Sequence, residues 1–67
     1  MSTATTVKIP RGAYCIEDAE WTRQDENGNT VFCSCSTYQF PNGKLAGFLI
    51  METDVFGSII DQCFDRA

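Results

Sequence analysis

The chain has 67 residues, of which 43% are hydrophobic and 21% charged, and its formal net charge is −4. This balance is typical of one small globular domain and argues against an intrinsically disordered chain. Nine acidic against five basic residues argue against direct nucleic-acid binding, which needs a basic surface. A core of this size supplies only about 3–5 kcal/mol, so a disulfide, a metal or a partner would be expected to add stability.

Residues 1–7 are polar and rich in threonine, and they are expected to form a flexible tail. The segment from Thr5 to Ile9 is a candidate for a short additional strand at an edge. No hydrophobic signal segment follows the first methionine, and the longest apolar run, Leu45 to Met51, is too short to cross a membrane. We therefore expect a cytoplasmic protein without membrane contact.

Three segments rich in β-branched, aromatic and other apolar residues predict strands over about 13–23, 30–40 and 45–53. Two Asn-Gly pairs, Asn27-Gly28 and Asn42-Gly43, separate these segments. Asn-Gly between apolar runs favours a two-residue hairpin loop, because both central residues of a type I′ turn need a positive φ. The three strands are therefore expected to form an antiparallel meander with 30–40 in the middle.

The hydrophobic period changes at the C-terminal end of the chain. The spacing of Val55, Ile59, Ile60, Cys63 and Phe64 places all five on one side of a helix. The pattern therefore predicts a helix over about 55–66. The expected fold class is α+β, with the meander and one C-terminal helix packed on one of its faces, in a single domain over 1–67.

Two-residue loops would fix the register, with Phe32 opposite Arg23 and Ser36 opposite Leu49. Directly paired residues point to the same side of a sheet, so this register collects most of the large apolar residues on one face. That face is the expected platform for the helix, which needs an apolar surface. Its predicted members are Cys15, Ala19, Trp21, Phe32, Tyr38, Phe40, Leu45, Leu49 and Met51.

The opposite face is expected to stay open and to combine apolar with acidic side chains. Contiguous apolar surface of this kind often marks an interaction site. We therefore predict that this face binds a partner protein. The predicted contact residues are Asp18, Glu20, Val31, Cys33, Cys35, Phe48, Ile50 and Glu52.

The four cysteines, Cys15, Cys33, Cys35 and Cys63, allow more than one interpretation. Reduced thiols that pack as small apolar side chains are the main expectation, and a Cys15–Cys63 disulfide or a four-cysteine zinc site are the alternatives. The chain has no histidine, and Cys33 and Cys35 are spaced Cys-x-Cys rather than Cys-x-x-Cys. We therefore expect no metal and no cofactor.

No arrangement of residues indicates catalysis. Without histidine a Ser-His-Asp triad is impossible, and a cysteine nucleophile would lack a base to activate it. The acidic residues Glu17, Asp18 and Glu20 are best explained as the solvated side of a strand. The chain is therefore not expected to be an enzyme, and it has no predicted catalytic residue.

These exclusions leave a small acidic protein-binding module, an inhibitor or adaptor that docks on a basic surface of a partner. In size, acidity and lack of catalytic groups, the whole chain is similar to the small inhibitors that phages and mobile elements encode against host defence, including anti-CRISPR proteins. That similarity involves no shared motif, and it implies an anti-defence inhibitor. The alternatives are a homo-oligomeric structural subunit, such as a homodimer, and a cysteine-based zinc-binding regulator.

Overall fold

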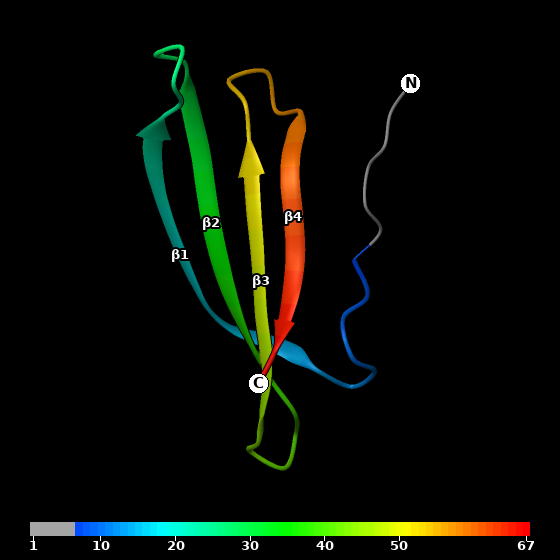
Figure 1. Ribbon diagram of the computed structural model, residues 1–67. Helices are drawn as coiled ribbons and strands as arrows, with labels where there is room; N and C mark the ends of the chain where they lie inside the picture. The colour runs from blue at the N-terminus through cyan, green and yellow to red at the C-terminus, as the bar shows by residue number, and fades with distance from the viewer. Residues whose placement is uncertain (1–6) are drawn as a thin grey trace.

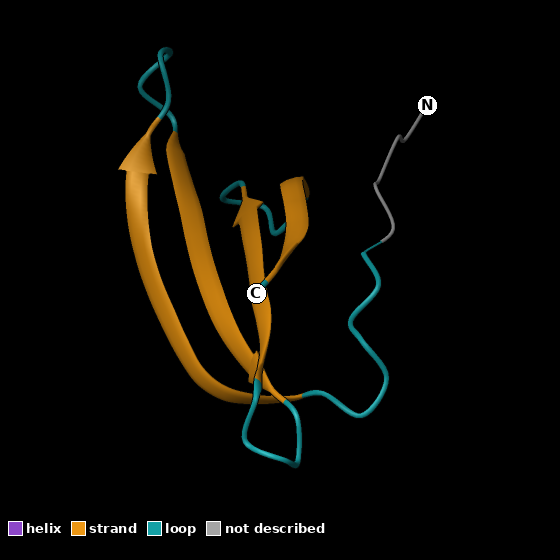
Figure 2. Ribbon diagram, turned by 60° about the horizontal axis from the view of Figure 1, so that its bottom comes forward, coloured by secondary structure: helices purple, strands orange, loops and turns teal. Residues whose placement is uncertain are grey.

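The computed structural model describes residues 7–67, which form four antiparallel strands in one sheet (Figure 1). The strands are β1 (Tyr14–Gln24), β2 (Thr30–Gln39), β3 (Leu45–Thr53) and β4 (Ile59–Arg66). They lie in the order β1-β2-β3-β4, so each strand pairs with its neighbours along the chain, and β1 and β4 are the two edges. Figure 2 shows a single twisted layer, with neither a helix nor a second sheet over it in residues 7–67.

The predicted C-terminal helix is wrong, and with it the α+β class, because this segment forms β4 and the described chain is all-β. A β-bulge explains the misleading spacing. The pairs Glu52↔Asp61 and Thr53↔Ile59 leave Ile60 as an extra residue in β4. An extra residue interrupts the alternation of a strand, so two neighbouring isoleucines imitate the spacing of a helical face.

The three predicted strands are confirmed as β1, β2 and β3. The described part of the expected additional edge strand, Val7 to Ile9, is not a strand. Its remaining residues, and all of the expected tail over 1–7 except Val7, lie outside the described part of the chain. The segment before β1 ends in a turn, in which Ala13 N–H donates to the carbonyl of Pro10 at 3.1 Å.

The three hairpins share one turn geometry. In each, a backbone hydrogen bond of 2.8–3.0 Å closes a loop of three residues, and the last loop residue is a glycine with φ between 82° and 89°. Three-residue hairpin loops of this kind contain a type I turn followed by a left-handed residue. The closing pairs are Asp25–Asn29, Phe40–Lys44 and Asp54–Ser58. The glycines are Gly28, Gly43 and Gly57.

The predicted two-residue loops are therefore too short by one residue. In the first turn, Asp25 Oδ1 accepts hydrogen bonds from the backbone N–H groups of Asn27 and Asn29, both at 2.9 Å. Asp54 Oδ1 makes the same pair of contacts in the third turn, with Phe56 at 2.8 Å and Ser58 at 2.9 Å. An aspartate side chain that imitates a backbone turn in this way stabilises the longer loop.

The longer first loop shifts β1 by one residue against the predicted register. Phe32 pairs with Thr22 rather than with Arg23, and Trp21 pairs with Cys33. A slip of one residue moves the side chains of a strand to the other face. Trp21 and Phe32 therefore lie on opposite faces of the sheet, although the sequence placed them together.

The register between β2 and β3 agrees with the prediction over most of its length. Ser36 pairs with Leu49, and Tyr38 pairs with Gly47, as expected. The loop is again longer than predicted, but a bulge that leaves Ala46 as an extra residue restores the pairing.

The pairing defines two faces, which we name after neighbouring residues near the middle of β2. The Cys33 face consists of Glu17, Ala19, Trp21, Arg23, Val31, Cys33, Cys35, Thr37, Phe48, Ile50, Glu52, Asp61, Cys63 and Asp65. The Ser34 face consists of Cys15, Asp18, Glu20, Thr22, Gln24, Thr30, Phe32, Ser34, Ser36, Tyr38, Gly47, Leu49, Met51, Thr53, Ile59, Gln62, Phe64 and Arg66.

Very little of this sheet is buried. The buried hydrophobic residues of the described chain are Val31 at 2%, Cys33 at 4% and Ala46 at 5% exposure. Every residue of β1 is exposed. A stable domain normally encloses its core between two layers of secondary structure, whereas residues 7–67 provide one layer and leave both of its faces without a second.

One close contact joins β3 to β4. The ring of Phe64 lies against Gly47, where a Cβ atom would come within 2.7 Å of the ring and within 2.5 Å of the backbone oxygen of Asp65. The same ring meets Tyr38 of β2 edge-to-face, with 6.0 Å between the ring centroids. The absence of a side chain at Gly47 therefore lets an aromatic pair cross the central strands.

Candidate functional site

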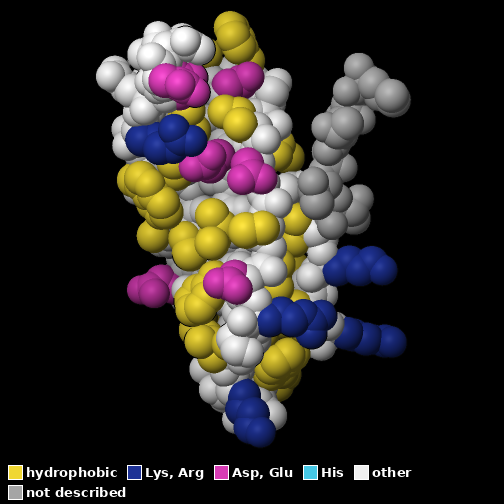
Figure 3. Space-filling model, viewed as in Figure 1, with side chains coloured by type: hydrophobic (Ala, Val, Ile, Leu, Met, Phe, Trp, Pro, Cys, Tyr) yellow, Lys and Arg dark blue, Asp and Glu magenta, His cyan; other side chains and the backbone are white. Residues whose placement is uncertain are grey.

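An apolar band crosses the Cys33 face from one edge of the sheet to the other. Ala19, Cys35, Ile50 and Cys63 occupy one continuous row over β1, β2, β3 and β4. Trp21 lies next to this row on β1, and its side chain is 49% exposed. Figure 3 shows a band of hydrophobic side chains across the middle of one face, with acidic side chains on both sides of the band.

Acidic residues stand at both edges of the same face. Glu17 belongs to β1, whereas Asp61 and Asp65 belong to β4, and all three are exposed. The register places Glu17 and Asp65 in one row across the sheet, with Thr37 and Phe48 between them. The apolar band is therefore bordered by negative charge on its β1 side and on its β4 side.

An ion pair covers the buried end of this band. Arg23 of β1 and Glu52 of β3 form two hydrogen bonds across β2, Nε to Oε2 at 3.1 Å and Nη2 to Oε1 at 2.9 Å. Arg23 pairs with Val31, and Glu52 pairs with Cys33, so the ion pair bridges the strand that carries the two buried residues. A planar guanidinium that binds a carboxylate through two hydrogen bonds holds this arrangement firmly.

The ion pair makes stability depend on pH. Hydrogen bonding from Arg23 and its charge lower the pKa of Glu52 below its ordinary value of 4.5, against an opposing effect of desolvation. A lowered folded-state pKa means that the contribution to stability is complete above pH 4.5 and is lost as the pH falls through the folded-state value. We expect the melting temperature of the wild type to fall more steeply in acid than that of Glu52→Gln.

Thermal melts over a series of pH values would measure this difference. Glu26→Gln is the control, because Glu26 is an exposed turn residue outside the ion pair. The melting temperature of Glu26→Gln should depend on pH in the same way as that of the wild type. Equal slopes for Glu52→Gln and the wild type would show that the ion pair does not contribute to stability.

The structure brings together six of the eight predicted contact residues. Val31, Cys33, Cys35, Phe48, Ile50 and Glu52 share the Cys33 face. The other two, Asp18 and Glu20, lie on the Ser34 face because of the shifted register. Within the six, Val31 and Cys33 are buried and Glu52 is paired with Arg23, so the surface open to a partner is smaller than predicted.

Sequence reasoning missed the residues that replace Asp18 and Glu20 on this face. The missed residues are Glu17, Ala19, Trp21, Asp61, Cys63 and Asp65. For β1, the signal was the Asp25-x-x-Gly28 pattern, which would have predicted the three-residue loop and the correct face. For β4, the matching pattern Asp54-x-x-Gly57 would have predicted a third hairpin instead of a helix.

The two misplaced acids belong to a polar group on the Ser34 face. Asp18 Oδ1 accepts hydrogen bonds from the Ser36 hydroxyl and from Cys15 Sγ, the latter at 3.3 Å. These bonds, that from Ser36 first, lower the pKa of Asp18. Desolvation and the contact with Asp18 raise the pKa of the Cys15 thiol. A raised pKa keeps a thiol in its neutral form, which is a poorer nucleophile than the thiolate.

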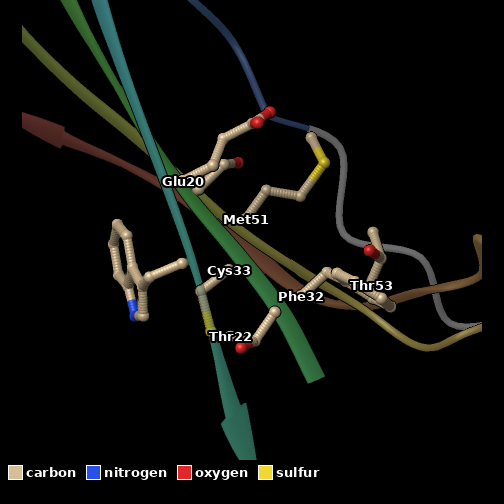
Figure 4. Close-up of a pocket in the computed structure, with 8 residues that line it drawn as sticks. Glu20, Thr22, Phe32, Cys33, Met51 and Thr53 are labelled. Carbon is tan, nitrogen blue, oxygen red and sulfur yellow. The ribbon is translucent and has the colours of Figure 1, made fainter. Parts of the chain in front are cut away.

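A shallow depression of about 400 Å³ lies on the Ser34 face over β1, β2 and β3. It is lined by Glu20, Trp21, Thr22, Phe32, Cys33, Ser34, Met51 and Thr53. Figure 4 shows the side chains of Met51 and Thr53 on the same side of the ribbons as Phe32. The lining is mainly apolar, and Glu20 is its one ionisable side chain on this face.

The cysteines do not converge. Cys15 is on the Ser34 face, whereas Cys33, Cys35 and Cys63 are on the Cys33 face, and all four are free thiols. The alternative disulfide between Cys15 and Cys63 is therefore not formed, because the two side chains project from opposite sides of the sheet. No group of three or more potential metal ligands occurs within residues 7–67, so this geometry gives the zinc alternative no support.

Two further findings do not depend on the two faces of the sheet. The described residues include no helix with the length and apolarity needed to cross a membrane. Comparisons of the chain with protein-family models, with curated proteins and with solved structures find no match.

Proposed function

We propose that this chain is a small, non-catalytic protein-binding module that docks its Cys33 face on a basic surface of another protein. The observation that supports the proposal is the apolar band, exposed on β1 and β4 and half-buried on β2 and β3, with acidic residues on both sides of it. Apolar contact area supplies affinity, whereas charges at the rim steer the approach and fix the orientation. This face carries Glu17, Glu52, Asp61 and Asp65 against the single base Arg23.

The charge of the Cys33 face selects the class of partner. Nucleic acids carry a dense negative charge that such a face repels, and the anionic surface of a cytoplasmic membrane is disfavoured for the same reason. A protein with a basic surface is attracted. The partner surface that fits best is apolar at its centre and has lysine or arginine side chains at its rim.

Trp21 is the residue on this face from which we expect the largest contribution to binding. Its side chain is half exposed, and it lies on the open strand β1 beside the apolar row. Tryptophan is enriched among residues that dominate binding energies, because it buries a large rigid surface at a low entropic cost.

A module of this kind acts by occupying a surface. A carboxylate-rimmed face can compete for a basic surface that otherwise binds phosphate groups, because both present negative charge. Inhibitors directed against nucleic-acid-binding defence proteins, as encoded by phages and mobile elements, are therefore the first class to test. We place the module in the cytoplasm, where its four free thiols would stay reduced.

The test compares two faces of one protein in affinity capture from a bacterial lysate. The baits are the wild type, Trp21→Glu and the double variant Asp61→Lys/Asp65→Lys, all of the Cys33 face, and Glu20→Lys of the Ser34 face as the charge control. We expect a captured protein that Glu20→Lys retains, that both Cys33-face variants lose, and that rising salt releases. Capture that does not distinguish the faces would refute the proposal.

The captured protein then provides a second, quantitative test. Its affinity for the wild type should fall at least tenfold with Trp21→Glu, and cross-links should connect the Cys33 face to lysine side chains of the partner. Cross-links that map only to the Ser34 face would place the interaction on the wrong side of the sheet.

A further inference from the structure

We propose that the Ser34 face is covered by a second copy of this chain, so that two sheets form a symmetric sandwich. This inference goes beyond the proposed function, because it concerns the other side of the sheet. The Ser34 face carries Phe32, Tyr38, Leu49 and Met51, which belong to the surface on which the sequence predicted that a helix would pack. The segment expected to form that helix forms β4 instead and extends the sheet sideways.

The exposed area shows how much surface is left without a cover. The chain exposes 5088 Å², whereas a compact protein of 7.5 kDa exposes about 4,200 Å². The single-layer sheet contributes to this difference, since every residue of β1 is exposed. A standard protein interface buries about 800 Å² on each partner, so covering one face would bring the exposed area close to that of a compact protein.

Charge determines which face a second copy can cover. In a two-fold symmetric contact each face meets itself, so an interface rich in one sign of charge is repelled. The Cys33 face has four acids against one base, whereas the Ser34 face has only Asp18, Glu20 and Arg66. Asp18 is already hydrogen-bonded to Ser36 and Cys15. The Ser34 face is therefore the one that can meet its own copy.

The centre of the Ser34 face is suited to such a contact. Phe32 lies toward one end of β2 and is 46% exposed, and the Tyr38–Phe64 pair lies toward the other end. Between them β2 presents the small side chains of Ser34 and Ser36, with Met51 and Leu49 opposite on β3. A two-fold axis that lies in the plane of the interface, perpendicular to the strands, would bring Phe32 of one copy onto the aromatic pair of the other, a favourable contact.

The two ends of the sheet favour the same orientation. The first and third turns lie at one end and carry Asp25, Glu26 and Asp54, whereas Lys44 and Arg66 lie at the opposite end. Figure 3 shows basic side chains gathered toward the lower end of the molecule. Stacking the two sheets with their strands antiparallel places the acidic end of each copy over the basic end of the other.

Analytical ultracentrifugation of the full chain at micromolar to submillimolar concentration tests this inference. We expect the wild type to sediment at twice the chain mass of 7.5 kDa. Phe32→Glu should weaken the dimer at least tenfold. Trp21→Glu is the matched control, because Trp21 has almost the same exposure, 49% against 46%, on the opposite face; it should remain dimeric.

Circular dichroism would confirm that the variants keep the sheet, and Met51→Glu provides a second substitution on the Ser34 face if Phe32→Glu does not fold. A charge exchange tests the orientation: Glu26→Lys and Lys44→Glu should each weaken the dimer, and the double variant should recover it. A wild type that stays monomeric, or a dimer lost with Trp21→Glu but kept with Phe32→Glu, would overturn the inference. Neither result would affect the capture test of the Cys33 face.

Discussion

Replacing Gly47 with alanine is expected to cause the largest loss of stability of any single methyl group added to this chain. The new Cβ atom would lie 2.5 Å from the backbone oxygen of Asp65 and 2.7 Å from the ring of Phe64. The oxygen belongs to the paired strand β4 and cannot move without disturbing the pairing. We expect the free energy of unfolding to fall by about 3 kcal/mol because of overpacking and backbone strain. This is most of the stability that a core of this size supplies.

Urea denaturation followed by circular dichroism would measure the loss for Gly47→Ala. Gly57→Ala is the control, because Gly57 also has a positive φ, 85°, but has no atom within 4 Å of an added Cβ. It should cost only about 1 kcal/mol. If the two variants lose equal stability, the unfavourable φ rather than the contact with β4 is responsible.

The second large effect is expected at Val31, the most deeply buried side chain that the structure describes. Val31 is 2% exposed and lies beneath the ion pair of Arg23 and Glu52. Truncation to alanine leaves a cavity that the surrounding strands cannot fill. We expect Val31→Ala to cost about 2 kcal/mol.

Val55→Ala makes the same chemical change at an exposed position, since Val55 is 58% exposed in the third turn. Val55→Ala should change the free energy of unfolding by no more than about 0.5 kcal/mol. Both variants should be measured at one fixed protein concentration, because dimerisation makes the apparent stability depend on concentration. Similar losses at the two sites would mean that Val31 does not contribute a core to this sheet.

The turns show how far local sequence determined this fold. The two Asn-Gly pairs correctly located the first two reversals of the chain, because glycine is needed where φ is positive. They did not give the length of either loop; in the first, Asp25 stabilises the three-residue form by accepting two backbone hydrogen bonds. One residue of difference was enough to exchange the faces of β1, so the predicted side of the sheet holds for the site residues of β2 and β3 but not for Asp18 and Glu20 of β1.

The C-terminal segment failed for another reason. The Ile60 bulge places apolar residues at spacings that fit a helix as well as a strand. A bulge is fixed by pairing with the neighbouring strand, and no property of the isolated segment reveals it. The sequence also did not predict that both faces of the sheet would lack a second layer. Hydrophobic periodicity identifies an apolar surface that needs to be buried, but it does not identify the molecule that buries it.

The two edge strands have a consequence for solubility. Within residues 7–67, β1 and β4 each leave one row of backbone N–H and C=O groups without a strand beside it. Such rows template the addition of further chains. Acidic residues along these edges, among them Glu17, Asp61 and Asp65, oppose that addition by repelling a second edge of the same charge. At the isoelectric point of 4.4 the net charge of the chain is zero, so repulsion between chains is weakest and we expect lateral growth of the sheet to be fastest there.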